Sequence, residues 1–143
     1  MTPLQAACYT AALANGGRLW RPFVVWQMLD NDGNVVRETP PLQNGTLPAS
    51  AESLEFVRNA MIEAVSGDNT SANAMQASIV PLAAKTGTAE VGKEPNKHKN
   101  TWIICYGPLP DPTFAVACVI EHGASGGRTT APVVVDFINT WLE

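Results

Sequence analysis

The stretch Phe114–Glu121 constrains the fold of this chain more than any other, because every residue before its final glutamate is apolar. Successive side chains in a β-strand point to opposite faces, so Phe114 and Val116 share one face and the residues between them share the other. A strand that is apolar on both faces is typical of a sheet covered on each side by another layer. We therefore predict a layered domain with this strand between its layers.

Two more strands are predicted before this one, at Leu82–Ala89 and Trp102–Tyr106. The polar stretch Glu90–Asn100 between them is interpreted as a loop, and Pro108–Thr113 as a short hairpin connection to the third strand. The order of the strands and the lengths of their connections predict a three-stranded antiparallel sheet.

Three helices are predicted to pack on this sheet, at Thr2–Asn15, from Ser50 to Ser66, and from Thr130 toward the C-terminus. Each begins with a Ser or Thr that suits an N-cap, and the first adds Gln5 for a capping box. The apolar face predicted for the first helix is narrow and consists of small residues with one leucine: Leu4, Ala7, Cys8, Ala11 and Ala14. Helices packed on an antiparallel sheet give an α+β fold.

An excursion away from this sheet is predicted between the first two helices. Residues Arg18–Met28 are rich in β-branched and aromatic side chains, Asp32-Gly33 is a hairpin signal, and Val35-Val36 is the predicted return strand. The proline-containing residues 40–48 are interpreted as an extended connector rather than a partner site.

Composition excludes several classes of function. The net charge of −4 leaves no basic stripe for nucleic acid, and 45% hydrophobic with 15% charged residues is typical of a globular domain. No apolar run approaches the roughly 20 residues that span a bilayer.

Met1 leads directly into a polar helix cap, so we expect no signal peptide here. Cys8, Cys105 and Cys118 lack metal or disulfide spacing and are predicted to be core thiols.

The tetrapeptide Lys85-Thr86-Gly87-Thr88 is the candidate site, because it places a cation, two hydroxyls and a glycine at the end of a predicted buried strand. In a strand, the hydroxyls of Thr86 and Thr88 share a face, and Lys85 starts on the other face with a stem long enough to reach around an edge. Gly87 allows a ligand or another backbone to come close. Such a site suits a carboxylate held by charge-assisted hydrogen bonds. The alternative is an exposed lysine and a turn glycine that end a strand.

Several motifs follow one another along nearly the whole chain: Thr2-Pro3-Leu4-Gln5, Ala14-Asn15-Gly16-Gly17, Lys85 to Glu90, Trp102 to Pro108, Glu121-His122-Gly123, Gly126-Gly127 and Ala131-Pro132. In this order and spacing they resemble the C-terminal part of the transpeptidase domain of penicillin-binding proteins, and most of all the class B type that works in cell elongation. K-T-G is among the motifs of this group of serine acyltransferases. The resemblance implies that residues 1–143 are the C-terminal portion of such a domain, within a serine β-lactamase-like fold.

Two motifs of that family are missing from this chain. The nucleophile motif Ser-x-x-Lys occurs at none of its serines, and it lies upstream in a full domain. Ser71-Ala72-Asn73 does match the middle motif Ser-x-Asn, but it follows the Thr-Pro-Leu-Gln helix instead of preceding it. On this spacing we interpret the match as a coincidence.

The resemblance implies an acyl transfer to serine from a D-alanyl-D-alanine stem peptide, or from a β-lactam that mimics it. Lys85 would supply positive charge near the donor's terminal carboxylate and the proton-relay groups, and the hydroxyls of Thr86 and Thr88 would hold that carboxylate. The Thr88 N–H would be one of two oxyanion donors. The chain alone should be inactive, and no cofactor or metal is implied. The parent protein would be membrane-anchored, at the outer face of a bacterial cytoplasmic membrane or in the periplasm.

Other polar residues are weaker candidates. His98 is expected in a solvated loop, although a place at the lip of a substrate site is an alternative, and Asn100 stands where family members often have a histidine. A general acid–base pair of Glu121 and His122 would have no nucleophile near it in the sequence. Gly126-Gly127 is interpreted as a turn, with an anion site at the following helix as the alternative.

The absent N-terminal half is the first expected partner, since it would pair with the strand Phe114–Glu121. Without it, we predict self-association through that strand, whose edge carries no Pro or Lys, next to Phe137, Ile138 and Trp141 of the last helix. A rival interpretation is a stand-alone, non-catalytic module that binds a peptidoglycan peptide or a protein of the cell-wall machinery. A Ser-x-x-Lys half in the upstream reading frame would distinguish the two.

Overall fold

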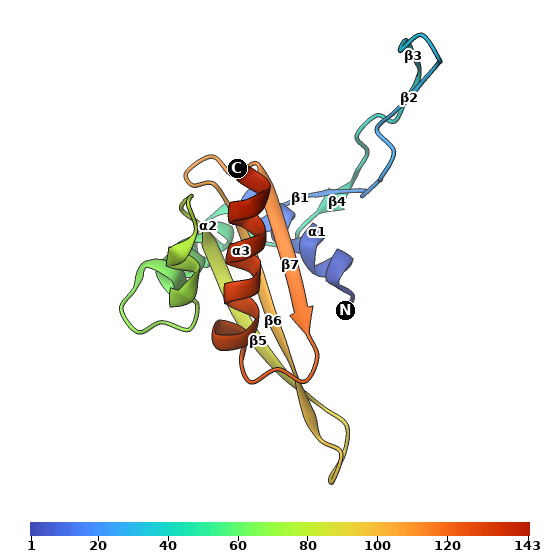
Figure 1. Cartoon of the computed structure of the whole chain (residues 1–143). Helices are drawn as coiled ribbons and strands as arrows, with labels where there is room; N and C mark the ends of the chain where they lie inside the picture. The colour runs from blue at the N-terminus through green and yellow to red at the C-terminus, as the bar shows by residue number, and fades with distance from the viewer.

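The computed structural model describes residues 1–143 and consists of a layered body with a long two-stranded arm (Figure 1). In chain order the elements are α1 (Pro3–Ala14), β1 (Arg18–Trp20), β2 (Gln27–Leu29), β3 (Val35–Glu38), β4 (Gln43–Thr46), α2 (Ala51–Ser66), a 3₁₀ turn η1 (Asn73–Ala77), β5 (Ala83–Val91), β6 (His98–Gly107), β7 (Phe114–Ile120), a π-helical turn η2 (Gly126–Thr130) and α3 (Ala131–Leu142). No helix is both long and apolar enough to cross a membrane.

The central sheet has the strand order β5-β6-β7 and is antiparallel throughout, as predicted. The loop predicted at Glu90–Asn100 is too long. The strands β5 and β6 stay paired as far as Val91 opposite His98, so only the residues between these two form the loop. This part of the hairpin projects beyond the helices into solvent, where polar side chains suit both faces of a strand (Figure 1). An ion pair with a Lys97 Nζ to Glu90 Oε2 distance of 2.6 Å joins its two sides.

Helices cover both faces of the sheet, which confirms the prediction from the apolar third strand. On one face, α3 packs over Ile103 and Cys105 in the larger core cluster. On the other face, α1 and α2 enclose a smaller cluster that includes Leu13, Met61 and Tyr106. The molecule is therefore α+β, with the sheet as its middle layer.

The first helix corrects one prediction. Its capping box is present, with Thr2 N–H donating to Gln5 Oε1 at 2.8 Å and Gln5 N–H donating to Thr2 Oγ1 at 3.2 Å. The predicted apolar face is not the buried one, however: the buried residues are Ala6, Thr10, Ala12 and Leu13, and Leu4 is 60% exposed. Thr10 is buried without penalty because its hydroxyl donates to the Ala6 carbonyl at 2.7 Å.

The last helix begins differently from the prediction as well. The Thr130 side chain does not cap α3, because Thr130 has helical dihedral angles, φ −89° and ψ −36°, instead of the extended backbone of an N-cap. The Thr130 hydroxyl instead meets the Thr101 hydroxyl at 2.8 Å, and Thr101 also donates to the Ile120 carbonyl at 3.2 Å. Both threonines are fully buried, so this pair ties β6 to the start of α3.

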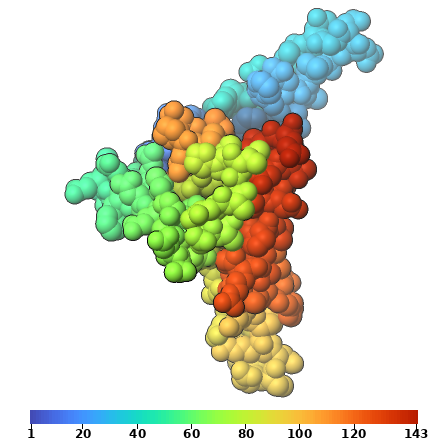
Figure 2. Space-filling view, turned by 60° about the vertical axis from the view of Figure 1, so that its left-hand side comes forward, coloured from blue at the N-terminus to red at the C-terminus, as the bar shows by residue number.

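The arm between α1 and α2 extends far from the body (Figures 1 and 2). Its predicted hairpin and return strand are confirmed, since Asp30 Oδ1 accepts from the N–H groups of Asp32 and Asn34, and Val35 lies in β3. The predicted strand Arg18–Met28 is broken into β1 and β2, with Pro22, which has no N–H, between them. Part of the predicted connector forms β4, which pairs with β1.

We predict that the buried threonine pair is a stabilising unit. Thr101→Val should leave the Thr130 hydroxyl buried without its partner and lower the free energy of unfolding by about 1–3 kcal/mol. The double variant Thr101→Val/Thr130→Val should recover most of that loss, because it removes both polar groups. Urea unfolding of the wild type, both single variants and the double variant measures this. Equal losses for the single and double variants would contradict the prediction.

The edge strand β7 generates a second prediction. The carbonyls of Lys99 and Gly107 in β6 accept from the N–H groups of Gly123 and Thr113, which flank β7, at 3.0 and 2.8 Å. Backbone groups alternate in direction along a strand, so every second residue of β6 from Lys99 to Gly107 bonds toward β7. The β7 residues opposite the others, Ala115, Ala117 and Val119, therefore direct their backbone groups to the free edge. Phe137 and Trp141 of α3 are 56% and 57% exposed, whereas Ile138, which was predicted to share that surface, is fully buried. These features favour association, and a symmetric pair of β7 strands is the simplest closed form.

We therefore expect the purified chain to sediment as a dimer whose population rises with concentration. Ala117→Pro should shift it toward monomer, because that residue's N–H points to the free edge and takes no part in the internal ladder. Val116→Pro is the matched control, expected to damage the fold itself, since Val116 pairs with Cys105. A folded wild-type monomer at high micromolar concentration would contradict the prediction.

Candidate functional site

The candidate tetrapeptide lies on β5, the other edge strand of the sheet. Alternate residues of β6 bond toward β7, so the residues between them bond toward β5. Thr86 and Thr88 lie opposite Ile103 and Thr101, which are among the β6 residues that bond toward β7. The N–H and C=O groups of both β5 threonines therefore point away from the sheet, along its free edge. An extended ligand can add to such an edge as an extra strand.

Side chains of the tetrapeptide divide between the two faces as predicted. Thr86 and Thr88 share the face of Ile103, which α3 covers, and Lys85 lies opposite Ile104 on the face of α1 and α2. The Lys85 Nζ nevertheless reaches the free edge, where it donates to the Thr86 carbonyl at 2.7 Å. Lys85 is exposed and has no carboxylate partner.

Gly87 is approached closely by another part of the backbone, as expected for a glycine here. The turn η2 lies against this strand, and a Cβ atom on Gly126 would be 3.0 Å from the Gly87 carbonyl and 2.5 Å from the Trp102 carbonyl. A Cβ atom on Gly127 would collide with the Ser71 carbonyl. Glycines at these two positions allow η2 to pack directly on β5 and on the linker before it. Gly126-Gly127 therefore opens a tightly packed π-helical turn instead of the predicted flexible one.

A pocket of about 480 Å³ opens between these elements. Its lining comes from the linker residues 70–74, from Thr86 and Thr88 of β5, and from residues 125–128 of the turn. Seven of the ten lining residues have polar side chains, and Arg128 is the one charged residue among them. The pocket holds hydroxyl and guanidinium donors but no histidine, carboxylate or lysine that would serve as a base.

Ser71 and Asn73 line this pocket too, although sequence spacing set them aside as a chance match to Ser-x-Asn. The linker brings them there by crossing from the α2 side of the sheet to the α3 side, where η1 packs against α3. The Asn73 amide donates to the Gly67 carbonyl at 3.3 Å, which helps to hold the linker in its bend. Sequence separation alone gave no sign of this proximity.

The remaining polar candidates lie elsewhere. His98 begins β6 and stacks on His122, with ring centroids 4.2 Å apart, so these two rings join the hairpin to the loop after β7. Asn100 lies on the same face as Lys85, and its Oδ1 is buried without a hydrogen-bond partner. The structure contains no group of side chains that could hold a metal ion.

Two cysteines outside the pocket lack the properties of an activated nucleophile. Burial raises the pKa of the Cys105 thiol to about 12, and burial also raises the pKa of Cys118. Both thiols are therefore protonated at neutral pH. Cys105 is a buried core thiol as predicted, whereas Cys8 and Cys118 are only partly buried, which corrects the prediction for those two. The hydrogen bond and charge of Lys97 lower the pKa of Glu90, and they keep that carboxylate ionised on the exposed hairpin.

Comparisons with known proteins match nearly the whole chain to one family. Residues 1–139 match the family model described as the penicillin binding protein transpeptidase domain. The peptidoglycan D,D-transpeptidase PbpA of Mycolicibacterium smegmatis is 33% identical over 141 residues, which cover 93% of this chain and 28% of that protein. Penicillin-binding protein 2B of Streptococcus pneumoniae is 26% identical over 152 residues, covering 99% of this chain and 22% of that protein.

Solved structures show the same likeness. The crystal structure of PBPA from Mycobacterium tuberculosis superposes with a TM-score of 0.82 at 30% identity, over 100% of this chain and 33% of that one. Penicillin-binding protein 2B from Streptococcus pneumoniae superposes with a TM-score of 0.85 at 25% identity, over 98% of this chain and 24% of that one. The chain thus spans about a third or less of the length of these relatives, and by its sequence and its fold it belongs to the transpeptidase domain family of penicillin-binding proteins.

Proposed function

We propose that this chain is the C-terminal part of a peptidoglycan D,D-transpeptidase domain and supplies the edge on which the donor peptide lies. The observation that carries the proposal is the outer edge of β5, where the N–H and C=O groups of Thr86 and Thr88 take no part in the sheet ladder and the Lys85 ammonium donates to the Thr86 carbonyl. A peptide added along such an edge gains main-chain hydrogen bonds without any change in the fold. β-Lactams would occupy the same edge. Support for this comes from penicillin-binding protein A of Mycobacterium tuberculosis, which forms an acyl-enzyme complex with imipenem.

Each residue of the tetrapeptide has a role in this proposal. The Thr88 N–H lies on the free edge and would donate to the oxyanion that forms when the scissile carbonyl is attacked. The hydroxyls of Thr86 and Thr88 would receive the terminal carboxylate of the donor. The Lys85 ammonium would keep the local potential positive for the proton relay, and Gly87 would keep the strand close to the turn that closes the pocket.

The serine nucleophile and its lysine base would come from residues outside this chain. Nucleophilic catalysis needs both groups within hydrogen-bond reach of each other, and no hydroxyl in the pocket has a base beside it. A complete protein of this kind would act at the outer face of the bacterial cytoplasmic membrane, where peptidoglycan is cross-linked.

We expect this chain alone to form no covalent adduct with a fluorescent penicillin. The reason is that its pocket offers donors for a bound ligand but no activated serine. Intact-mass measurement after incubation checks this, with a complete penicillin-binding protein as the positive control. A stoichiometric adduct traced to any serine of residues 1–143 would contradict the proposal that the nucleophile lies outside.

In a complete domain that contains this chain, Lys85→Ala should lower the acylation rate by roughly two to three powers of ten, because it removes preorganised positive charge from the reacting edge. Lys85→Arg should lose less, since the charge remains while its geometry changes. Stopped-flow acylation by a chromogenic β-lactam measures both rates. Near-wild-type rates for both variants would mean that Lys85 is only the exposed end of a strand.

A further inference from the structure

The structure separates the two cations of the site. Lys85 starts on the α1 and α2 face, and its Nζ donates to the Thr86 carbonyl at 2.7 Å. The hydroxyl-bearing side chains of Thr86 and Thr88 are on the opposite face, toward α3. The cation that lines a pocket together with these hydroxyls is Arg128.

Packing around the turn fixes the backbone of Arg128 in this place. The Arg128 N–H donates to Ser125 Oγ at 3.3 Å, and the Thr129 N–H donates to the Ser125 carbonyl at 2.8 Å. Gly126 is buried against the carbonyls of Gly87 and Trp102. The backbone that carries the Arg128 side chain is therefore held beside β5.

Nothing within the chain uses the charge of Arg128. The one ion pair of the structure joins Lys97 and Glu90 on the distant hairpin, and no carboxylate lines the pocket. A planar guanidinium with free donors beside two hydroxyls is suited to a carboxylate, which accepts paired, charge-assisted hydrogen bonds. A pocket of about 480 Å³ has room for such a group.

We infer that Arg128 is a specificity-determining residue of the site, the cation that receives the terminal carboxylate of a ligand bound along β5 together with Thr86 and Thr88. This inference rests on the proposed function and adds a cation to the carboxylate end of that site. Lys85 acts at the reacting end of the edge, and Arg128 distinguishes an ionised ligand terminus from a neutral one.

The test compares two ligands that differ only in this terminus. N-acetyl-D-alanyl-D-alanine carries the carboxylate, and its C-terminal amide does not. Titration of the isotopically labelled 143-residue chain, followed by the amide NMR signals of Thr86 to Thr88 and of the turn 125–128, gives an apparent dissociation constant for each ligand. The acid should bind more tightly than the amide, and added salt should weaken only the acid.

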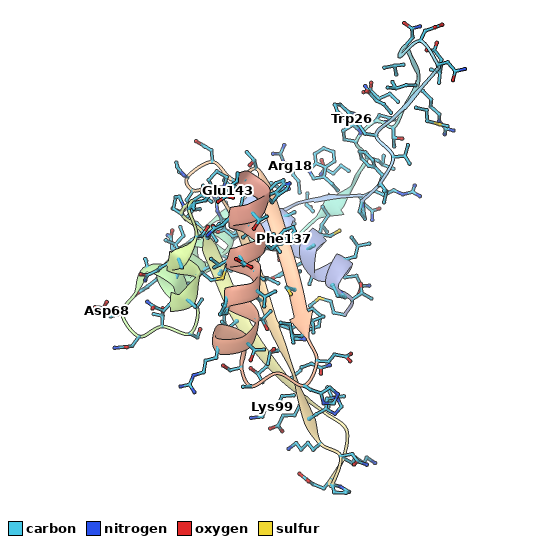
Figure 3. The ribbon with its side chains drawn as sticks, viewed as in Figure 1. Arg18, Trp26, Asp68, Lys99, Phe137 and Glu143 are labelled. Atoms are coloured by element: carbon cyan, nitrogen blue, oxygen red, sulfur yellow. The ribbon has the colours of Figure 1, made fainter.

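Three variants isolate the contribution of Arg128. Arg128→Gln should weaken binding of the acid by about three- to fivefold, a modest factor because the side chain is exposed, and leave the amide unchanged. Arg128→Lys should retain part of the preference for the acid. Arg18→Gln is the matched control, with the same charge change at the base of the arm (Figure 3), and should bind both ligands as the wild type does.

The outcomes separate this inference from the proposed function. Loss of the acid preference in Arg128→Gln, with Arg18→Gln unchanged, supports the inference. An acid preference that persists in Arg128→Gln but disappears in Thr88→Val overturns the role of Arg128 and leaves the proposed function in place. Equal binding of acid and amide to the wild type also overturns it. The absence of any response at Thr86 to Thr88 with either ligand counts against both.

Discussion

The pairing register between β5 and β6 is the constraint on which the rest of the site depends. With Lys85 opposite Ile104 and Thr86 opposite Ile103, the ladder directs the backbone of Thr86 and Thr88 to the free edge and their side chains toward α3. A shift by one residue would exchange both directions at once, because the period of a strand is two. The register is held by β6, whose two faces are buried in separate clusters that include Ile103 on one side and Tyr106 on the other.

The pocket beside this edge depends on close backbone contact. Gly126 and Gly127 bring the turn against β5 and against Ser71 of the linker, and a side chain at either position would push these layers apart. The buried pair of Thr101 and Thr130 hydroxyls fixes the far end of the same turn at 2.8 Å. Elements on three sides therefore surround the hydroxyls of Thr86 and Thr88 and fix the backbone of Arg128 beside them, an arrangement that positions these residues before a ligand arrives.

Much of the fold could be predicted from the sequence, and the errors have local causes. The strand at Phe114–Glu121 was recognisable because apolar residues on both faces require cover on both faces. The outer part of the β5–β6 hairpin, residues 90–100, is predicted as a loop because polar residues indicate exposure to solvent, and the strand ends that project from the body are exposed to solvent as well. The buried face of α1 differs from the predicted one because small residues pack almost as well on one side of a helix as on the next. In the structure, the face that contains Leu13 packs on the sheet.

By itself, the sequence determined the chemical groups of the site and their faces along one strand: a cation, two hydroxyls and a glycine at fixed spacing, with the hydroxyls on one side. Only the tertiary structure decided which distant groups meet them. Arg128 follows Thr88 by a hairpin, a strand and a loop, and Ser71 precedes it by a bent linker, so neither neighbour leaves a periodic signal in the sequence. Local alternation is set by backbone geometry, whereas contacts between segments far apart in the chain follow from how the layers close around the core.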